Sequence, residues 1–223
     1  MASAWPRTAA ELEQRQLELA DLEPMPWTFA DGAVIGGCFV CFPRRPAGPG
    51  AEGDRAWAAA ATAADAAVIG GSASAPYAPG LLALREGSLL EAAVRALRRP
   101  PDVLLVDATG RDHPRGAGLA LQLGAVLDVP TVGVTHRPLL ALGRWPAREA
   151  RGATSPLLLA DRPVGFWLRT RTGARPLAVH PGWRTDARTA CAVVLASVSR
   201  ARTPEPLRTA RRLAREGRAS AGA

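Results

Sequence analysis

Apolar positions along the chain recur first at helical and then at strand spacing. Residues 8–22 predict an amphipathic helix, because Leu12 and Leu19 lie on one face. Thr8 and Glu11 have the spacing of a capping box at its start. The chain therefore opens with a helix whose apolar side packs against the rest of the protein.

A buried strand and a Pro-rich loop come next. Residues 24–32 form a link that carries Pro and Trp, and the β-prone apolar run 34–42 ends before a proline and predicts a strand. Residues 43–55 are rich in Pro, Gly and Arg and predict a loop. The Ala-rich segment 56–69 fits a helix or a strand, and its position makes it a plausible hairpin partner of the first strand.

Further elements alternate in the same way. Residues 75–80 predict a rigid loop, and Ser88 and Glu91 have capping-box spacing for a helix through residue 97. Residues 103–107 read as a short central strand that ends in an acid, and Pro114 stands at the first position of a helix that ends near residue 127. The remaining predictions are a strand at 131–135, strands within 157–168 and 176–180, and helices near 186–199 and 205–217.

This alternation predicts an α/β fold with a mixed sheet flanked by helices. A length of 223 residues suits one domain with a substantial core. We expect its parts to be an N-terminal helix and link at 1–32, a core at 33–217 and a flexible tail at 218–223.

The composition predicts a cytoplasmic protein. Hydrophobic residues make up 48% of the chain, yet no apolar run is long enough for a membrane helix, and the first thirty residues lack the apolar core of a secretory signal. Cys38 and Cys41 are spaced as in redox or zinc motifs, but they lie in a strand pattern and no second pair accompanies them. We interpret both as buried small apolar residues.

The net charge of +8 is carried entirely by arginine, since the sequence contains no lysine. The planar arginine side chain can give phosphate two parallel hydrogen bonds, so nucleic acid is a candidate partner. An arginine bias can also reflect only the base composition of the gene. A row of arginines also lies on a predicted helix near the carboxyl end. It either follows a phosphate backbone or forms a solvated helix face, and its members are Arg208, Arg211, Arg212 and Arg215.

Two carboxylates and two histidines are candidates for chemistry. Asp107 closes a buried strand, where α/β proteins present reactive groups, and Glu86 follows the rigid loop. Carboxylates from two elements can hold Mg²⁺, although a lone strand-end Asp is more often a turn or capping residue. His113 is a ligand contact or a helix cap, and His136 ends a strand on the same expected edge as Asp107 or is an ordinary surface residue.

The order of short motifs along the chain resembles the endonuclease V family. The motifs are Pro-Tyr-Ala-Pro-Gly-Leu-Leu-Ala-Leu-Arg-Glu at 76–86, Val-Asp-Ala-Thr-Gly at 106–110, His-Pro-Arg at 113–115, Asp-Val-Pro-Thr-Val-Gly-Val at 128–134, Pro-Gly at 181–182 and Thr-Pro-Glu-Pro-Leu-Arg at 203–208. The similarity extends over most of the chain, and the first three motifs are specific to the family.

The resemblance implies an RNase H-like fold and Mg²⁺-dependent cleavage of DNA or RNA near inosine, which is deaminated adenine. Glu86 and Asp107 match two metal carboxylates of the family. Tyr77 matches the aromatic residue of a loop that wedges into the helix beside the lesion, where stacking on a base contributes about 1–3 kcal/mol. By the same match, the wedge and the pocket for the flipped base comprise Pro76, Tyr77, Pro79, Gly80, Leu82, Ala108, Gly110 and His113.

Four positions depart from the family pattern. Phe39 stands at the first metal Asp, and a late metal-site position falls near Arg188. His136 stands at a family lysine, and Trp183 stands at a family histidine. The acids and histidine that could restore the site are Asp31, His136 and Asp186.

These matches and departures leave two classes of function open. The first is a monomeric nuclease in which Glu86 and Asp107 hold Mg²⁺, or Mn²⁺, and His136 donates to phosphate or shuttles a proton. The second is a protein that keeps the base pocket and binds nucleic acid with impaired cleavage. A third hypothesis is that the protein is a family member that acts on another nucleotide-like substrate.

Overall fold

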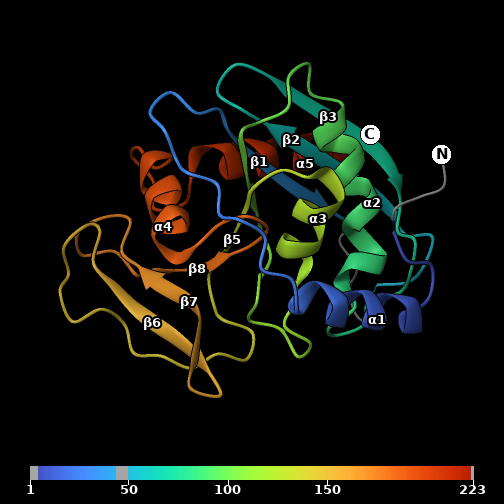
Figure 1. Cartoon of the computed structure of the whole chain (residues 1–223). Helices are drawn as coiled ribbons and strands as arrows, with labels where there is room; N and C mark the ends of the chain where they lie inside the picture. The colour runs from blue at the N-terminus through green and yellow to red at the C-terminus, as the bar shows by residue number, and fades with distance from the viewer. Residues whose placement is uncertain (1–4, 44–49, 222–223) are drawn as a thin grey trace.

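A computed structural model describes residues 5–43 and 50–221, which form one eight-stranded mixed sheet and five helices (Figure 1). The strands are β1 (Ile35–Cys41), β2 (Arg55–Ala61), β3 (Ala66–Ser72), β4 (Val103–Val106), β5 (Thr131–Thr135), β6 (Thr154–Leu159), β7 (Arg162–Leu168) and β8 (Leu177–Pro181). The helices are α1 (Ala9–Ala20), α2 (Leu82–Arg95), α3 (Leu119–Leu127), α4 (Ala187–Ala196) and α5 (Glu205–Ser220). The expected α/β class is confirmed.

The centre of the sheet is parallel and its flanks are antiparallel. The strand order is β3-β2-β1-β4-β5-β8-β7-β6, and β4 pairs in parallel with both β1 and β5. All four residues of β4 are buried, as expected for a strand covered on both faces. The carboxyl ends of β1, β4 and β5 therefore meet at one edge, which is where the sequence places Asp107.

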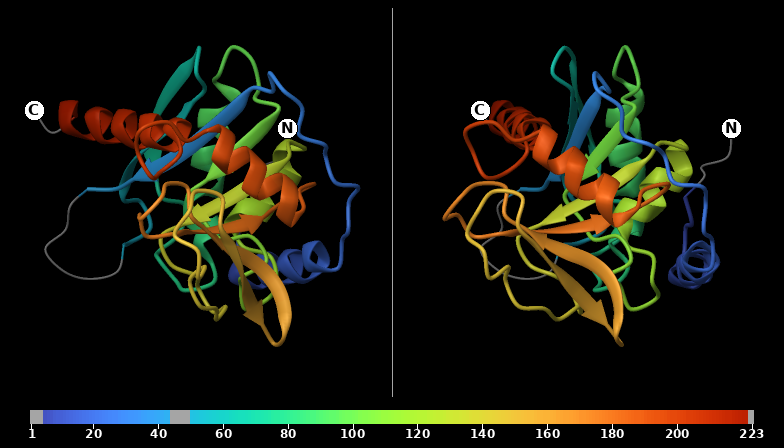
Figure 2. Two further views of the ribbon diagram at one scale, coloured as in Figure 1. Left: turned by 90° about the vertical axis from the view of Figure 1, so that its left-hand side faces the viewer. Right: turned by 60° about the vertical axis from the view of Figure 1, so that its left-hand side comes forward.

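Helices cover both faces of the sheet. Val40 and Leu104 share one core cluster with residues of α2 and α3, while Leu105 and Val132 pack with residues of α4 and with Leu207 of α5. The helix α1 lies outside α2 and α3, and both views of Figure 2 place it on the opposite side of the molecule from α5. The sheet is therefore enclosed between two layers of helices.

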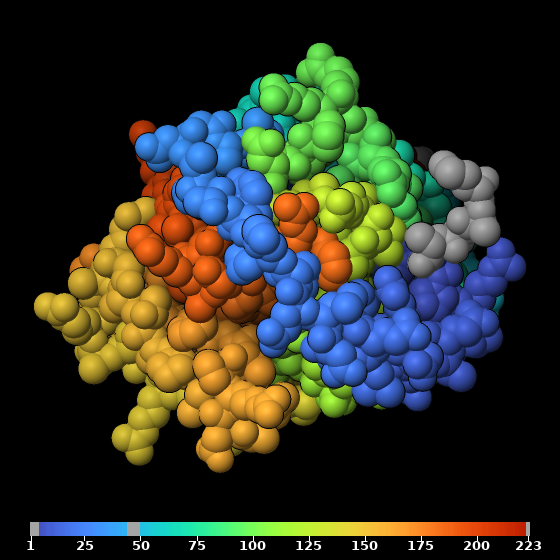
Figure 3. All heavy atoms as spheres, viewed as in Figure 1, coloured from blue at the N-terminus to red at the C-terminus, as the bar shows by residue number. Residues whose placement is uncertain are grey.

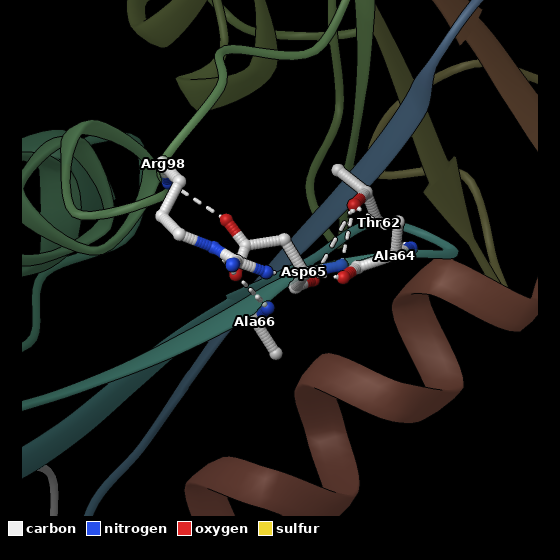
Figure 4. A network of polar contacts seen from close by, with 5 residues as sticks. All are labelled: Thr62, Ala64, Asp65, Ala66 and Arg98. Carbon is white, nitrogen blue, oxygen red and sulfur yellow. Dashed lines mark hydrogen bonds and ion pairs between the residues drawn. The ribbon is translucent and has the colours of Figure 1, made fainter.

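The Ala-rich segment is a β-hairpin, so its predicted role as a strand partner is confirmed. The turn between β2 and β3 is closed by Thr62 and Asp65, whose side chains accept hydrogen bonds from neighbouring backbone N–H groups (Figure 4). Asp65 also accepts the backbone N–H of Arg98 at 2.7 Å and pairs with its guanidinium, and these contacts lower the pKa of Asp65. The hairpin tip is thus tied to the chain that follows α2.

Two predicted helix starts are wrong. The helix α2 begins at Leu82, so Ser88 lies inside it and makes no cap, while Glu91 accepts a hydrogen bond from Trp5. Pro114 does not open α3: a turn closed by the His113 carbonyl precedes Gly118, the residue before the first turn. In both cases burial of the apolar side chains decides where the helix begins, whereas local capping signals do not.

The predicted strand within 157–168 is two strands. Ala160 and Asp161 both have positive φ, at 47° and 63°, which is the backbone of a tight two-residue hairpin between β6 and β7. The other predicted strands and helices occur close to the expected places. Part of the predicted loop 43–55, residues 44–49, lies outside the described residues.

The last helix continues beyond its predicted end at residue 217. The helix α5 continues to Ser220, into the segment predicted as a flexible tail, and Arg218 donates to the Phe42 carbonyl at 3.1 Å. The predicted link after α1 crosses one face of the molecule (Figure 3), where the Trp27 N–H donates to the Arg184 carbonyl at 2.7 Å. No helix in the described part of the chain is long and apolar enough to span a membrane.

The cysteines are free, and Cys38 and Cys41 are buried. Burial and the nearby carboxylates Asp107 and Glu86 raise the pKa of Cys38, and burial likewise raises the pKa of Cys41. Since the thiolate is the reactive form, we expect a thiol reagent at neutral pH to label both slowly in the native protein and rapidly after denaturation. Fast native labelling of Cys38 would contradict this interpretation.

Candidate active site

A pocket of about 290 Å³ opens at the carboxyl edge of the central strands. Asp107 and Ala108, which follow β4, form one wall, and the loop that ends at Gly80 forms another. The predicted site residues in its lining are Tyr77, Pro79, Gly80, Leu82, Asp107, Ala108 and His113. Segments far apart in the sequence thus meet at one small, partly apolar cavity.

The loop of residues 75–80 is held at one end by hydrogen bonds to the Gly80 carbonyl. Gln16, His113 and Arg115 approach it with nitrogen atoms at 3.0, 3.1 and 3.1 Å. His113 Nε2 donates this bond while Nδ1 accepts the backbone N–H of Arg115, and burial lowers the pKa of His113, so the ring is neutral. These contacts, together with the positive φ of Gly80, 76°, hold the loop in one conformation.

The loop is also braced from its other end by Arg85. The guanidinium donates to the Ala75 carbonyl, to the Ala51 carbonyl and to Asp54, and it stacks on the Phe42 ring at 4.0 Å. The side chains of Arg85 and Asp54 are only 4% and 3% exposed. Between these two anchors, Tyr77 is 49% exposed.

Asp112 holds the far wall. Its buried carboxylate accepts three backbone N–H groups, from Leu139, Leu140 and Ala141, at 2.6 to 2.8 Å. The lining residues 137–139 therefore form a fixed wall. The sequence interpretation missed Asp112, Gln16 and Arg85, although a glutamine on the apolar face of α1, in line with Leu12 and Leu19, was a signal.

Two predicted pocket residues do not line the cavity. Pro76 is exposed on the loop before Tyr77. Gly110 is buried behind the lining, where a Cβ atom would lie 2.2 Å from the Pro181 carbonyl oxygen. Its lack of a side chain therefore serves the close approach of β8 and does not form a contact surface for a ligand.

Glu86 lies near Asp107 but, unlike Asp107, is not part of the pocket lining. Burial raises the pKa of Glu86 to about 8, an effect that Arg85 opposes and the Asp107 charge reinforces. At neutral pH the Glu86 carboxyl is therefore largely protonated. Cys38 of β1 pairs with Val106 of β4 in the parallel register. The residues that follow them in the two strands, Phe39 and Asp107, therefore stand beside each other.

The cation beside Asp107 is Arg211 of α5. Its Nη2 lies 2.8 Å from the Asp107 carboxylate, and its guanidinium lies 5.2 Å from the centre of the Phe39 ring. The expectation that Arg188 takes this place is wrong, since Arg188 is exposed in the first turn of α4. The helical arginine row was noted in the sequence, but nothing in it singled out Arg211 as the residue that reaches the strand end.

His136 is exposed next to the same edge. Its Nδ1 accepts a hydrogen bond from Arg202 at 2.8 Å, and its pKa is lowered by partial burial and by Arg202 and Arg211, against the opposing charge of Asp107. The ring is therefore neutral at pH 7. Because Nδ1 accepts from Arg202, the proton of the neutral ring lies on Nε2, which can donate a hydrogen bond to phosphate without a positive charge.

The other residues considered for a metal site have separate roles. Asp186 caps α4 by accepting the Thr189 N–H at 2.7 Å, and Asp31 is exposed in a turn. Trp183 donates its indole N–H to Asp128 at 3.3 Å. Within the described residues, no group of three or more His, Cys, Asp or Glu side chains that could hold a metal ion is found.

An arginine-lined groove of about 530 Å³ continues from Arg211 along α5. Two members of the row are paired within the helix, Arg208 with Glu205 and Arg212 with Glu216. The arginines in its lining are Arg202, Arg208, Arg211, Arg212 and Arg215. The row is thus a solvated helix face that also lines a positive groove, and the Arg211–Asp107 ion pair links this groove to a residue of the pocket.

Comparison with known proteins decides the family. The Endonuclease V family model matches residues 55–212. The chain belongs to the endonuclease V family. It is 36% identical over 218 residues to endonuclease V of Azotobacter vinelandii, across 94% of this chain and 95% of that protein. It is 46% identical over 136 residues to endonuclease V of Thermus thermophilus, a match that spans 60% of either protein.

Solved endonuclease V structures share the fold. The enzyme from Streptomyces avermitilis superposes with a TM-score of 0.86 at 34% identity, over 99% of this chain and 97% of that one. Ciona intestinalis endonuclease V, in complex with a 24mer DNA that contains inosine, has a TM-score of 0.71 at 19% identity, over 95% and 98%. The expected RNase H-like fold is confirmed.

Proposed function

We propose that this endonuclease V family member is a monomeric nuclease that recognises inosine in DNA or RNA and acts on a nearby phosphodiester bond. One observation carries the proposal: a base-sized pocket behind an exposed aromatic residue is lined by Asp107, whose carboxylate pairs with Arg211 of the arginine-lined groove. The relatives named endonuclease V, one of which was solved with inosine-containing DNA, support this assignment.

Recognition would begin with extrusion of the deaminated base. Tyr77 would stack in the space that the base leaves, and its exposure and doubly anchored loop suit that role. The base would enter the pocket between Gly80 and Ala108, while the strand backbone follows the arginine groove. A lining held by fixed backbone contacts favours selection by shape and by hydrogen bonds to the base edge.

The family implies a divalent metal, and Glu86 and Asp107 are the residues that we propose as its ligands. Their present surroundings do not suit an ion, because Asp107 is paired with Arg211 and Phe39 contributes no ligand atom. This observation favours a second candidate function, a lesion-binding protein that cuts poorly. Mn²⁺, which accepts carboxylate and imidazole ligands, would then support cleavage better than Mg²⁺.

A binding assay tests recognition directly. We expect tighter binding to an inosine-containing duplex than to its undamaged counterpart, with both affinities falling steeply as salt rises because counterions are released. Tyr77→Ala should reduce the preference for inosine by about tenfold, within the energy of one base stack. Trp145→Ala, which removes another half-exposed aromatic residue outside the pocket, should not reduce it.

Two outcomes would refute the recognition proposal. One is an equal affinity for both duplexes at every salt concentration. The other is a preference for inosine that survives Tyr77→Ala. A nicking assay on the same substrates separates the two candidate functions: bound but uncut inosine DNA supports the lesion-binding protein.

A further inference from the structure

The Arg211 side chain occupies the corner between the ends of β1 and β4. Its guanidinium pairs with Asp107 on one side and faces the Phe39 ring on the other. Phe39 stands beside Asp107 because of the parallel register of the two strands. A positive charge thus lies where two neighbouring strands present one carboxylate and one aromatic ring.

The position of Arg211 is fixed because α5 packs closely against the sheet. Ala210 and Ala214 are fully buried, and a Cβ atom on Gly37 of β1 would lie 2.6 Å from the backbone of Leu207. Small residues on both elements let the helix backbone approach β1 closely. Arg211, which follows Ala210, therefore starts close to the strand end, and its guanidinium reaches Asp107.

The contacts of Arg211 suit a cation that stays in place but can be displaced. Attraction to the carboxylate and to the face of the aromatic ring both favour the charged guanidinium there. The Arg211 and Asp107 side chains remain 21% and 26% exposed, so solutes can reach the pair. Phosphates in the adjoining arginine groove would offer the guanidinium another acceptor with matching geometry.

We propose that Arg211 is a built-in cation that competes with a divalent metal ion for Asp107, so that the site, with the residues present, does not suit such an ion. The proposal deepens the proposed nuclease function, on which it rests, by naming what controls metal binding at that site. An ion and a guanidinium at the same carboxylate carry like charges that repel at such short range.

Metal titration of the free protein tests this competition without any cleavage. The measurement is the Mn²⁺ affinity, by calorimetry, of the wild type, of Arg211→Ala and of Arg212→Ala. Arg212 is the matched control, because it is the next residue of α5, carries the same charge and pairs with Glu216 instead of Asp107. We expect Arg211→Ala to bind Mn²⁺ at least about tenfold more tightly, as removal of one adjacent charge predicts, and Arg212→Ala to match the wild type.

A double variant locates the bound ion. Arg211→Ala combined with Asp107→Asn should lose the gain in Mn²⁺ affinity, since the carboxylate that Arg211 released is gone. If Arg211→Ala lowers the melting temperature enough to prevent titration, Arg211→Met keeps the aliphatic stem over Phe39 and takes its place. The same gain is expected for Arg211→Met.

The outcomes separate the two proposals. An unchanged Mn²⁺ affinity after loss of Arg211, or an equal gain in Arg212→Ala, would overturn the competition proposal. A gain that persists in the Asp107→Asn double variant would do so too. A gain confined to Arg211 supports the proposal even if no variant nicks DNA, and that last result would count against the nuclease function alone.

Discussion

Replacing Phe39 and Arg211 together by aspartate should raise the rate of Mg²⁺-dependent nicking at inosine by about a hundredfold or more, because a well-held metal supplies several kcal/mol of charge stabilisation in the transition state. The change adds a carboxylate beside Asp107 and removes the cation paired with it. Each single change should do much less, since both act on one ion and their effects are not additive.

The matched control for this rebuilt site is Phe39→Asp combined with Arg188→Asp. It makes the same pair of residue changes, but Arg188 is exposed on α4 and the Asp107–Arg211 ion pair remains. We expect nicking close to that of Phe39→Asp alone. Brisk Mg²⁺-dependent cutting by the wild type that Asp107→Ala abolishes would contradict this account, and activity that survives Asp107→Ala would place the chemistry elsewhere.

Asp54→Ala should lower the free energy of unfolding by about 3–5 kcal/mol, because it leaves the buried Arg85 guanidinium without its carboxylate. For a chain of this size, the expected fall in melting temperature is on the order of 10 °C. Arg85 also anchors the Ala75 carbonyl before Tyr77, so the preference for inosine should weaken as well. Thermal unfolding and the duplex binding assay measure the two effects.

Glu216→Ala provides the comparison for a carboxylate paired with arginine at the surface. The side chains of Arg212 and Glu216 are 60% and 56% exposed, so loss of this pair should cost less than about 1 kcal/mol. Asp54→Ala combined with Arg85→Met should restore part of the lost stability, since no buried charge is left unpaired. If Asp54→Ala is no more destabilising than Glu216→Ala, the ion pair does not brace the loop.

Local sequence signals correctly predicted those helices and strands in which the periodicity of the apolar side chains matches their burial in the structure. The first helix, with Thr8 as its cap, and the central strand before Asp107 are of this kind. Capping signals failed where burial favoured another start: Ser88 lies inside α2, and Pro114 lies in a turn before α3. A capping residue contributes about 1 kcal/mol, less than the burial of one or two apolar side chains.

The residues of the candidate site also differ in whether the sequence alone could predict their positions. Its residues from contiguous motifs, such as Tyr77 and Asp107, could be placed from the sequence because each motif folds as a unit. Arg211 and Asp112 could not, because their partners lie 104 and about 28 residues away and only the packing of α5 and of the 137–141 loop brings them together. The resemblance alone placed Arg188 at the late metal-site position. In the structure the arginine that contacts Asp107 is Arg211, which lies on another helix.

The Gln16 contact shows that the pocket is assembled from segments that lie far apart in the sequence. Gln16 bridges Arg115 and the Gly80 carbonyl from α1, yet the family match starts only at residue 55. A fragment trimmed to the matched range would lose this bridge together with β1 at the centre of the sheet. Minimal versions of the protein and mutational libraries therefore need the first helix, even though the family profile does not extend to it.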